Sequence, residues 1–251
     1  MSHAEPVLRA RELTRRFGGL VAVDRVSLDV HRGSVHAVIG TNGAGKSTLV
    51  NVLAGEIPAS GGSVALRGHD VTRWPQPRRA RAGIGRSYQR TTLFMQFSVL
   101  ENCRLAAQAH HQKPWSLWTD AAACPLAVPA AREAAARAGL AGVLDTPAFA
   151  LSHGQRRQLE IAMCLATGPE VLLLDEPLAG MGAEETERML ALLGELKAGH
   201  AIVLVEHDMD AVFRIADTIT VMVNGAVLAS GAPSAVRANA DVQAAYLGET
   251  A

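Results

Sequence analysis

Cysteine is scarce in this chain of 251 residues, and its spacing excludes two common uses. The three cysteines, Cys103, Cys124 and Cys164, are odd in number and form no C-x-x-C pair. Disulfide frameworks and zinc sites both depend on closely patterned cysteines. We therefore expect a reduced, cytosolic chain, and we expect His110 and His111 to bind no metal although they lie near two of the cysteines.

An excess of charge of either sign is also missing. Lys+Arg and Asp+Glu both total 24, so the formal net charge is zero. Domains that bind nucleic acid usually carry a basic excess that neutralises phosphates. The balance therefore argues against a nucleic-acid partner.

Long hydrophobic runs are absent as well. Residues 1–13 are charged and have no apolar core, which argues against a signal peptide. The most apolar stretch, Ala121–Ala131, is interrupted by Pro125 and Pro129 and is shorter than the roughly 20 residues of a membrane helix. If the protein serves transport, other chains must form the pathway.

Hydrophobic residues nevertheless make up 49% of the chain, enough for a sizeable core. The length fits one large domain, or one domain with an inserted lobe. Alternating apolar strands and helices predict an α/β fold with a mostly parallel sheet and an antiparallel β edge. The division that we predict is a core of residues 1–92 and 152–230, an α-helical subdomain of residues 93–151 and a helical tail of residues 231–251.

Individual elements follow from periodicity and turn residues. An antiparallel pair of strands is expected over residues 7–30 around Phe17-Gly18-Gly19, with edge strands near residues 64–66 and 68–71. Arg73–Gly83 carries Arg78, Arg79 and Arg81, which we interpret as a solvated helix face or loop, with phosphate binding as the alternative. Further elements are predicted at Ala130–Leu140, Ser152–Ala166, Val171–Leu174, Ala183–Lys197, Ala201–Val205, Ile219–Val223 and Ala226–Ala229.

The most informative motif is a glycine-rich loop, Gly40-Thr41-Asn42-Gly43-Ala44-Gly45-Lys46-Ser47, which fits the pattern G-x-x-x-x-G-K-S. An expected strand over Val35–Ile39 precedes it, and an expected helix over Thr48–Ala54 follows it. Because glycines lack side chains, backbone N–H groups can surround phosphate oxygens there, and the helix N-terminus adds partial positive charge. Lys46 then reaches the β- and γ-phosphates, and the Ser47 hydroxyl ligates Mg²⁺. A chance glycine turn is the alternative.

A second motif is the apolar strand Val171–Leu174, which ends in Asp175 and Glu176. A phosphate-loop enzyme needs a carboxylate at such a strand end to hold Mg²⁺, and Asp175 fits that role. The adjacent Glu176 can polarise an attacking water. An apolar strand that ends in two acids is common by itself. Its position downstream of a phosphate loop is what favours a catalytic role over a structural one.

A third motif, Leu151-Ser152-His153-Gly154-Gln155, opens the helix after the predicted lobe. Ser152 and Gln155 have the S-x-x-Q spacing of a capping box. The same helix tip presents Gly154 and free N–H groups, which make an anion site. Both interpretations can hold at once.

These three motifs, in this order, resemble the ATP-binding cassette subunits of ABC transporters. Gln89 before the lobe and His207 after the strand at Ala201–Val205 extend the resemblance over essentially the whole chain. It implies a P-loop NTPase (RecA-like) core with an inserted α-helical subdomain. It also implies a head-to-tail pair of cassettes that bind ATP and Mg²⁺ between them, and hydrolysis that drives membrane partners.

The resemblance implies a role for each matching residue. Glu176 would be the catalytic base, His207 would contact the γ-phosphate, and Phe17 matches the position that stacks on adenine. Mg²⁺ and the attacking water would be served by Ser47, Gln89 and Asp175. The phosphates would lie against Gly40, Asn42, Gly43, Ala44, Gly45, Lys46, Ser47 and Thr48, and the opposite subunit's ATP would be capped by Ser152, Gly154 and Gln155.

Three positions depart from the family pattern. His153 replaces the second residue of the usual Ser-Gly-Gly-Gln run, and Thr41 replaces a frequent proline. Gly182 stands where the loop after Glu176 usually carries Asp or Asn. The resemblance therefore does not carry over the side-chain coupling that this position gives across the dimer.

Further stretches are similar to cassettes of branched-chain amino-acid and urea/amide importers, namely Phe17–Val23, Leu178–Met181, Val205–Met209 and Ala245–Gly248. We favour an importer of branched-chain or hydrophobic amino acids, with transmembrane permease subunits, a second cassette and, indirectly, a periplasmic solute-binding protein as partners. The expected location is the cytoplasmic face of the bacterial inner membrane. The alternatives are a urea/amide importer, an export cassette of the lipopolysaccharide type and a non-transport ATPase.

The apolar stretch Leu93–Phe97 follows Gln89 closely. It is either part of the lobe core or a partly exposed groove that accepts a short helix of a membrane subunit.

Overall fold

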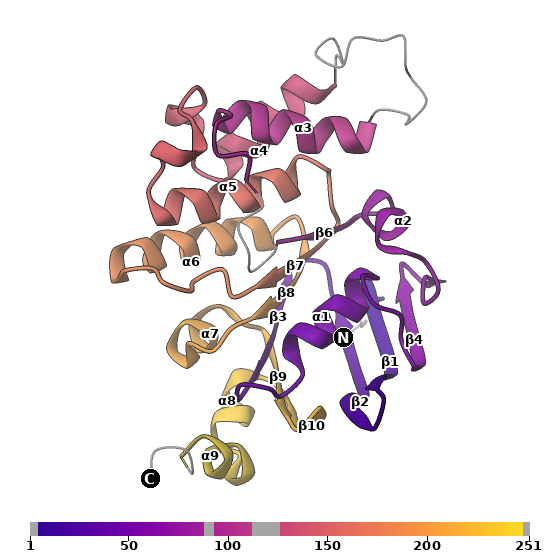
Figure 1. Cartoon of the computed structure of the whole chain (residues 1–251). Helices are drawn as coiled ribbons and strands as arrows, with labels where there is room; N and C mark the ends of the chain where they lie inside the picture. Colours follow the sequence, from indigo (N-terminus) through magenta and orange to yellow (C-terminus); the bar gives the residue numbers. More distant parts are fainter. Residues whose placement is uncertain (1–4, 88–92, 112–125, 248–251) are drawn as a thin grey trace.

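The computed structural model describes residues 5–87, 93–111 and 126–247, and their strands form two sheets (Figure 1). Six strands have the order β10-β9-β3-β8-β7-β6, and four have the order β2-β1-β4-β5. The larger sheet contains β3 (Ser34–Gly40), β6 (Ile84–Arg86), β7 (Val171–Asp175), β8 (Ala201–Val205), β9 (Thr218–Val223) and β10 (Ala226–Gly231). All its pairings are parallel except that of β9 with β10, which confirms the expected α/β fold.

Register brings three of the predicted site segments to one edge of the larger sheet. β8 lies between β3 and β7, with Val38 and Asp175 both paired to Val205. The phosphate loop after β3, Glu176 after β7 and His207 after β8 therefore leave the sheet side by side. Ligands of parallel α/β sheets bind at this edge, beyond the carboxyl ends of the strands.

The smaller sheet is antiparallel and forms the expected β edge. It consists of β1 (Leu8–Phe17), β2 (Leu20–Val30), β4 (Gly61–Leu66) and β5 (His69–Asp70). Helix α1 (Lys46–Ala54) starts at the phosphate loop, and its apolar residues pack in one buried cluster with side chains of both sheets. Gly55 follows α1 in the left-handed conformation that ends a helix, with φ of 80°. The two sheets thus hold α1, and with it the loop, from both sides.

Helices lie on the other side of the larger sheet, where α5 (His153–Leu165), α6 (Ala183–Lys197) and α7 (Met209–Ile215) cover its face. Helices α3 (Val99–His111) and α4 (Ala127–Arg137) stack on α5 rather than on the sheet, and α8 (Pro233–Arg237) and α9 (Ala240–Leu247) follow near β10 (Figure 1). α4 begins three residues before the predicted start at Ala130. The reason is that Pro129 occupies the first turn, where a missing N–H is tolerated.

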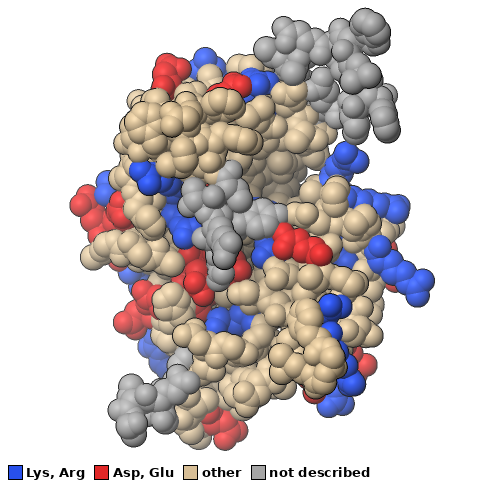
Figure 2. All heavy atoms as spheres, viewed as in Figure 1, with Lys and Arg blue, Asp and Glu red and all other residues tan. Residues whose placement is uncertain are grey.

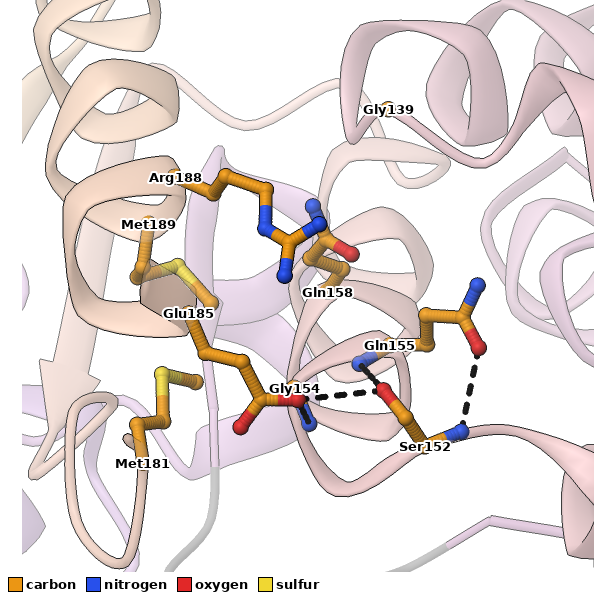
Figure 3. Close-up of a pocket in the computed structure, with 9 residues that line it drawn as sticks. All are labelled: Gly139, Ser152, Gly154, Gln155, Gln158, Met181, Glu185, Arg188 and Met189. Atoms are coloured by element: carbon orange, nitrogen blue, oxygen red, sulfur yellow. Dashed lines mark hydrogen bonds between the residues drawn. The ribbon is translucent and has the colours of Figure 1, made fainter. Parts of the chain in front are cut away.

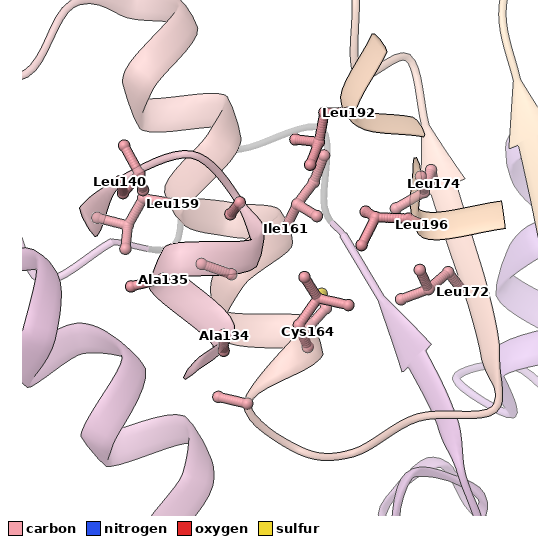
Figure 4. Close-up of a cluster of buried hydrophobic side chains, with 14 of the residues drawn as sticks. Ala134, Ala135, Leu140, Leu159, Ile161, Cys164, Leu172, Leu174, Leu192 and Leu196 are labelled. Carbon is pink, nitrogen blue, oxygen red and sulfur yellow. The ribbon is translucent and has the colours of Figure 1, made fainter. Parts of the chain in front are cut away.

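One buried cluster connects the lobe helices to the sheet (Figure 4). Ala134 and Ala135 of α4 pack with Leu159 and Ile161 of α5, and the cluster continues through Leu192 of α6 to β7. The apolar residues of α6 that helical spacing assigned to the core, Met189, Leu192, Leu193 and Leu196, are all buried. This packing fixes the N-terminus of α5 relative to the start of α6.

Arg79 corrects the interpretation of the arginines on α2 (Gln76–Arg81). Arg78 and Arg81 are exposed as expected, along an edge where Figure 2 shows positive side chains, but Arg79 is only 1% exposed. Its guanidinium donates to four backbone carbonyls, those of Val52 (2.8 Å), Leu53 (2.7 Å), Thr72 (2.8 Å) and Trp74 (3.1 Å). Burial lowers the pKa of Arg79 to about 10, which leaves it charged at neutral pH.

We expect Arg79→Met to lower the free energy of unfolding by about 3 kcal/mol or more, because it leaves buried carbonyl groups without a donor. Arg81→Met is the matched control, since Arg81 is exposed on the same helix. Urea unfolding followed by circular dichroism measures both. Equal midpoints for the two variants would show that the carbonyls find other partners.

Candidate functional site

The phosphate loop connects β3 to α1, and two of its glycines are required by close backbone contacts. A Cβ atom on Gly40 would lie 2.2 Å from the Met222 carbonyl oxygen, and one on Gly45 would lie 2.1 Å from that of Ala22. Gly45 also has a φ of 96°, which side chains disfavour. The loop is therefore held against β9 and β2 in a shape that only glycine allows at these positions.

Lys46 is the first residue of α1, and its side chain folds back over the loop. Its Nζ atom donates to the carbonyl oxygens of Gly40 (2.6 Å) and Thr41 (3.0 Å). Burial lowers the pKa of Lys46, and the charges of Glu176 and Asp175 oppose this shift. The cation thus sits at the centre of the loop with two carboxylates nearby.

Asp175, the last residue of β7, is buried beside α1. Burial raises its pKa, whereas the charge of Arg86 and a hydrogen bond with the Ser47 hydroxyl lower it. One carboxylate oxygen, Oδ1, is buried and has no hydrogen-bond partner among the described residues. A buried carboxylate oxygen beside a hydroxyl is a donor set that suits Mg²⁺, which prefers hard oxygen ligands.

Glu176 leaves the sheet through an unusual backbone turn. Its φ is 52°, in the left-handed region that is strained for a residue with a side chain, and its N–H donates to the Val205 carbonyl at 2.9 Å. The side chain lines the same hollow as Lys46 and Ser47. The strained turn therefore aims a carboxylate at the phosphate loop.

The hollow over the loop has a volume of about 520 Å³ and extends to the β edge. Phe17, at the end of β1, lines it, and its ring is 45% exposed. The Arg15 guanidinium lies 4.4 Å from the centroid of that ring. The hollow is lined by Phe17, Leu20, Val21, Ala22, Asn42 to Thr48, Glu176, Asn224 and Gly225. The structure thus places an exposed aromatic ring beside the phosphate loop.

His207 follows β8, and its side chain is exposed. The residue before it, Glu206, is fully buried, and its carboxylate accepts the N–H groups of Leu178 (2.8 Å) and His207 (3.2 Å). Burial raises the pKa of Glu206, and the two hydrogen bonds oppose that shift. Sequence reasoning did not assign Glu206 to the site. Glu206 connects the loop after Glu176 to the His207 backbone. The sequence feature that could have revealed this role is an acidic residue directly after the apolar strand β8.

The Ser152 motif forms the predicted cap of α5. The Ser152 hydroxyl accepts the Gln155 N–H at 3.2 Å, and Gln155 Oε1 accepts the Ser152 N–H at 3.0 Å. This confirms the capping box. The tip lines a separate hollow of about 400 Å³, together with Glu185 and Arg188 of α6 (Figure 3). Within one chain, therefore, Ser152 and Lys46 belong to different hollows.

Two further positions singled out in the sequence are Gln89 and Gly182. Gln89 lies outside the described residues. Gly182 is the N-cap of α6 and gives no side-chain hydrogen bond there, as its lack of a side chain requires. In the described parts of the chain, no three His, Cys, Asp or Glu residues gather as a metal site, and no helix has the length and apolarity to cross a bilayer.

The chain is similar to known proteins in both sequence and structure. Residues 23–179 match the family model described as ABC transporter, and residues 226–251 match the one described as branched-chain amino acid ATP-binding cassette transporter. The crystal structure of a nucleotide-free ATP-binding cassette from an ABC transporter superposes with a TM-score of 0.86 at 30% identity, over 96% of this chain and 98% of that one. The ADP conformation of MJ1267, an ATP-binding cassette of an ABC transporter, gives 0.85 at 29% identity, over 98% and 100%.

The chain belongs to the ABC transporter family, as an ATP-binding cassette with ATPase activity. In sequence it is similar to the high-affinity branched-chain amino acid transport ATP-binding protein LivG of Salmonella typhimurium, at 40% identity over 98% of this chain and 99% of that protein. The protein of the same description called BraF, from Pseudomonas aeruginosa, is 39% identical over 98% and 99%. The resemblance inferred from the motifs is thereby confirmed.

Proposed function

We propose that this cassette hydrolyses ATP to energise the uptake of branched-chain or hydrophobic amino acids through separate membrane subunits. The observation that carries the proposal is the similarity to LivG and BraF over nearly the full length, together with the C-terminal match at residues 226–251. The cassette sits at the cytoplasmic face of the inner membrane. A periplasmic binding protein delivers the solute to the membrane subunits.

The phosphates of ATP bind the loop amides and Lys46, and Phe17 stacks on the adenine. Ser47 and Asp175 would hold Mg²⁺, a role supported by the Oδ1 atom of Asp175, which has no hydrogen-bond partner among the described residues. When bound, Mg²⁺ would neutralise the negative charge that develops on the phosphate. Glu176 accepts a proton from the attacking water, because it faces the same hollow as Lys46. His207 contacts the γ-phosphate from the end of β8.

A second cassette completes each site. The tip at Ser152 and the loop at Lys46 line separate hollows in one chain, so neither can contact the same nucleotide without a partner. In a head-to-tail pair, the tip of one chain reaches the γ-phosphate held by the other. ATP binding closes the pair, and hydrolysis reopens it.

A urea/amide importer is the second candidate. The observations that favour it are His153 and the Gly180-Met181 pair, where Gly180 has a φ of 75° and packs against the His153 ring. Reconstitution with the membrane subunits and binding protein distinguishes the two. Uptake of labelled leucine driven by ATP supports our proposal, and uptake of urea with no response to leucine would replace it.

The apolar stretch after residue 92 supports the predicted groove for a membrane subunit. Leu93 is buried, whereas Phe94 and Phe97 are 53% and 43% exposed and stack with ring centroids 5.5 Å apart. The buried Asn102 side chain accepts the Phe94 N–H and donates to the carbonyls of Phe94 and Phe97. The two rings are thus held outward on a fixed loop.

We expect Phe94→Asp and Phe97→Asp to lower ATP-driven uptake several-fold while ATP hydrolysis by the isolated cassette is retained, because a charge would have to be buried in the apolar contact. Leu228→Asp, at an exposed position on β10, is the control. Uptake and phosphate release are measured in parallel. Unchanged uptake in both phenylalanine variants would rule out this docking surface.

A further inference from the structure

An acidic side chain of the same chain already occupies the tip of α5. Oε1 of Glu185 accepts the Gly154 N–H at 3.1 Å and the Ser152 hydroxyl at 3.2 Å (Figure 3). A Cβ atom on Gly154 would lie 2.7 Å from that oxygen, so the carboxylate rests directly on the glycine backbone. Glu185 lies in the first turn of α6, so it faces two helix N-termini at once.

These two donors are the ones that the proposed function assigns to the γ-phosphate of the partner's ATP. A carboxylate oxygen and a phosphate oxygen cannot both accept them, because the two groups would overlap and because both are negative. A hydrogen bond from the tip to the nucleotide therefore requires that the Glu185 carboxylate first leaves Ser152 and Gly154.

The same hollow contains a cation that can receive the displaced group. Arg188 lies three residues after Glu185 on α6, and Figure 3 shows its guanidinium extending from α6 toward α5, beside Gln158. Residues three apart on a helix are neighbours on its surface. At present Arg188 pairs with Glu184 at 3.5 Å, a contact between exposed side chains that is readily exchanged.

We propose that Glu185 is a positioning residue that occupies the phosphate site of the α5 tip in the separated cassette and gives it up when the partner's nucleotide arrives. The proposal rests on the head-to-tail arrangement under "Proposed function". Glu185 keeps Ser152 and Gly154 oriented while the cassettes are apart, and it raises the ATP concentration needed to join them. When the donors change from the carboxylate to the phosphate, the first turn of α6 loses its contact with the α5 tip. Nucleotide binding is thereby coupled to the start of α6.

The test measures ATP-driven pairing rather than turnover. In a Glu176→Gln background, which slows hydrolysis, light scattering gives the concentration of Mg-ATP for half-maximal dimerisation. We expect Glu185→Gln to lower that concentration about threefold to tenfold, because a neutral acceptor holds the donors about half as strongly as a charged one. Arg188→Gln should raise it. Glu195→Gln, an exposed acid on the same helix, should leave it unchanged.

A second measurement needs no nucleotide. In the free cassette, Glu185→Ala should move the Gly154 amide proton resonance upfield because its charged acceptor is lost, whereas Glu195→Ala should not. An unmoved resonance, or equal dimerisation for Glu185→Gln and Glu195→Gln, would overturn the proposal. If the Glu176→Gln parent forms no dimer with Mg-ATP at all, the head-to-tail arrangement itself fails, and the amide measurement still tests the contact.

Discussion

Glu176→Gln should still bind ATP and should lose about 10²- to 10⁴-fold in turnover, the range that general base catalysis usually contributes. The amide has the size of the carboxylate, so it can keep the place of Glu176 in the hollow above Lys46. It cannot accept a proton from water. The loss should therefore fall on hydrolysis rather than on nucleotide binding.

Two assays separate these effects for the Glu176 variant. Calorimetric titration with Mg-ATP gives the affinity, and single-turnover phosphate release gives the rate of the chemical step. Glu133→Gln is the matched control, because Glu133 is exposed on α4 away from the hollow. Hydrolysis at the unaltered rate in Glu176→Gln would mean that another group activates the water.

Most of the fold could be predicted from local pattern. β3, β7 and β8 are short apolar runs with clear boundaries, and α6 begins and ends at the residues that its spacing and charges indicated. The phosphate loop could be recognised from its local pattern, although the contacts that require Gly40 and Gly45 are tertiary ones, with β9 and β2. Such a motif can be recognised in a sequence because a single requirement, the binding of phosphate, determines several consecutive residues.

Non-local hydrogen bonds are what the sequence could not predict. Arg79 is buried because carbonyl groups from α1 and from the segment before α2 surround it, and no local charge pattern reveals that. Glu206 and Glu185 accept N–H groups from Leu178 and Gly154, which lie about 30 residues away along the chain. For an acid on a helix or at a strand end, exposure to solvent is the ordinary expectation. Only the fold shows that these acids hold functional loops.

The separation of the hollow at Lys46 from the hollow at Ser152 also depends on non-local contacts that the sequence does not reveal. Sequence order places Ser152 and Lys46 on one chain, and only the resemblance to a family implied that they act on different nucleotides. In the structure, the capped tip of α5 is tied to α6 through Glu185 and not to the phosphate loop. We therefore propose that the tip serves a neighbour's nucleotide once Glu185 has left it.

Lys46→Ala should weaken nucleotide binding about ten- to hundredfold, because hydrogen bonds to charged groups contribute about 1.5–3 kcal/mol. In the free cassette, Nζ is bonded to the carbonyls of Gly40 and Thr41, so the lysine also holds the loop together. The two contributions can be separated by comparing nucleotides. Loss of a direct phosphate contact should weaken ATP more than AMP, whereas a disordered loop should weaken both.

Calorimetry with ATP, ADP and AMP measures this, with Lys197→Ala as the control because Lys197 lies at the far end of α6 and pairs with Asp217 at 2.7 Å. Equal affinity of Lys46→Ala and the unaltered chain for ATP would contradict the placement of phosphate over the loop. Burial disfavours the charged form of Lys46, and a phosphate beside Nζ should favour it. The Lys46 ammonium and the N–H groups of the loop therefore favour phosphate groups, and among nucleotides they favour the triphosphate.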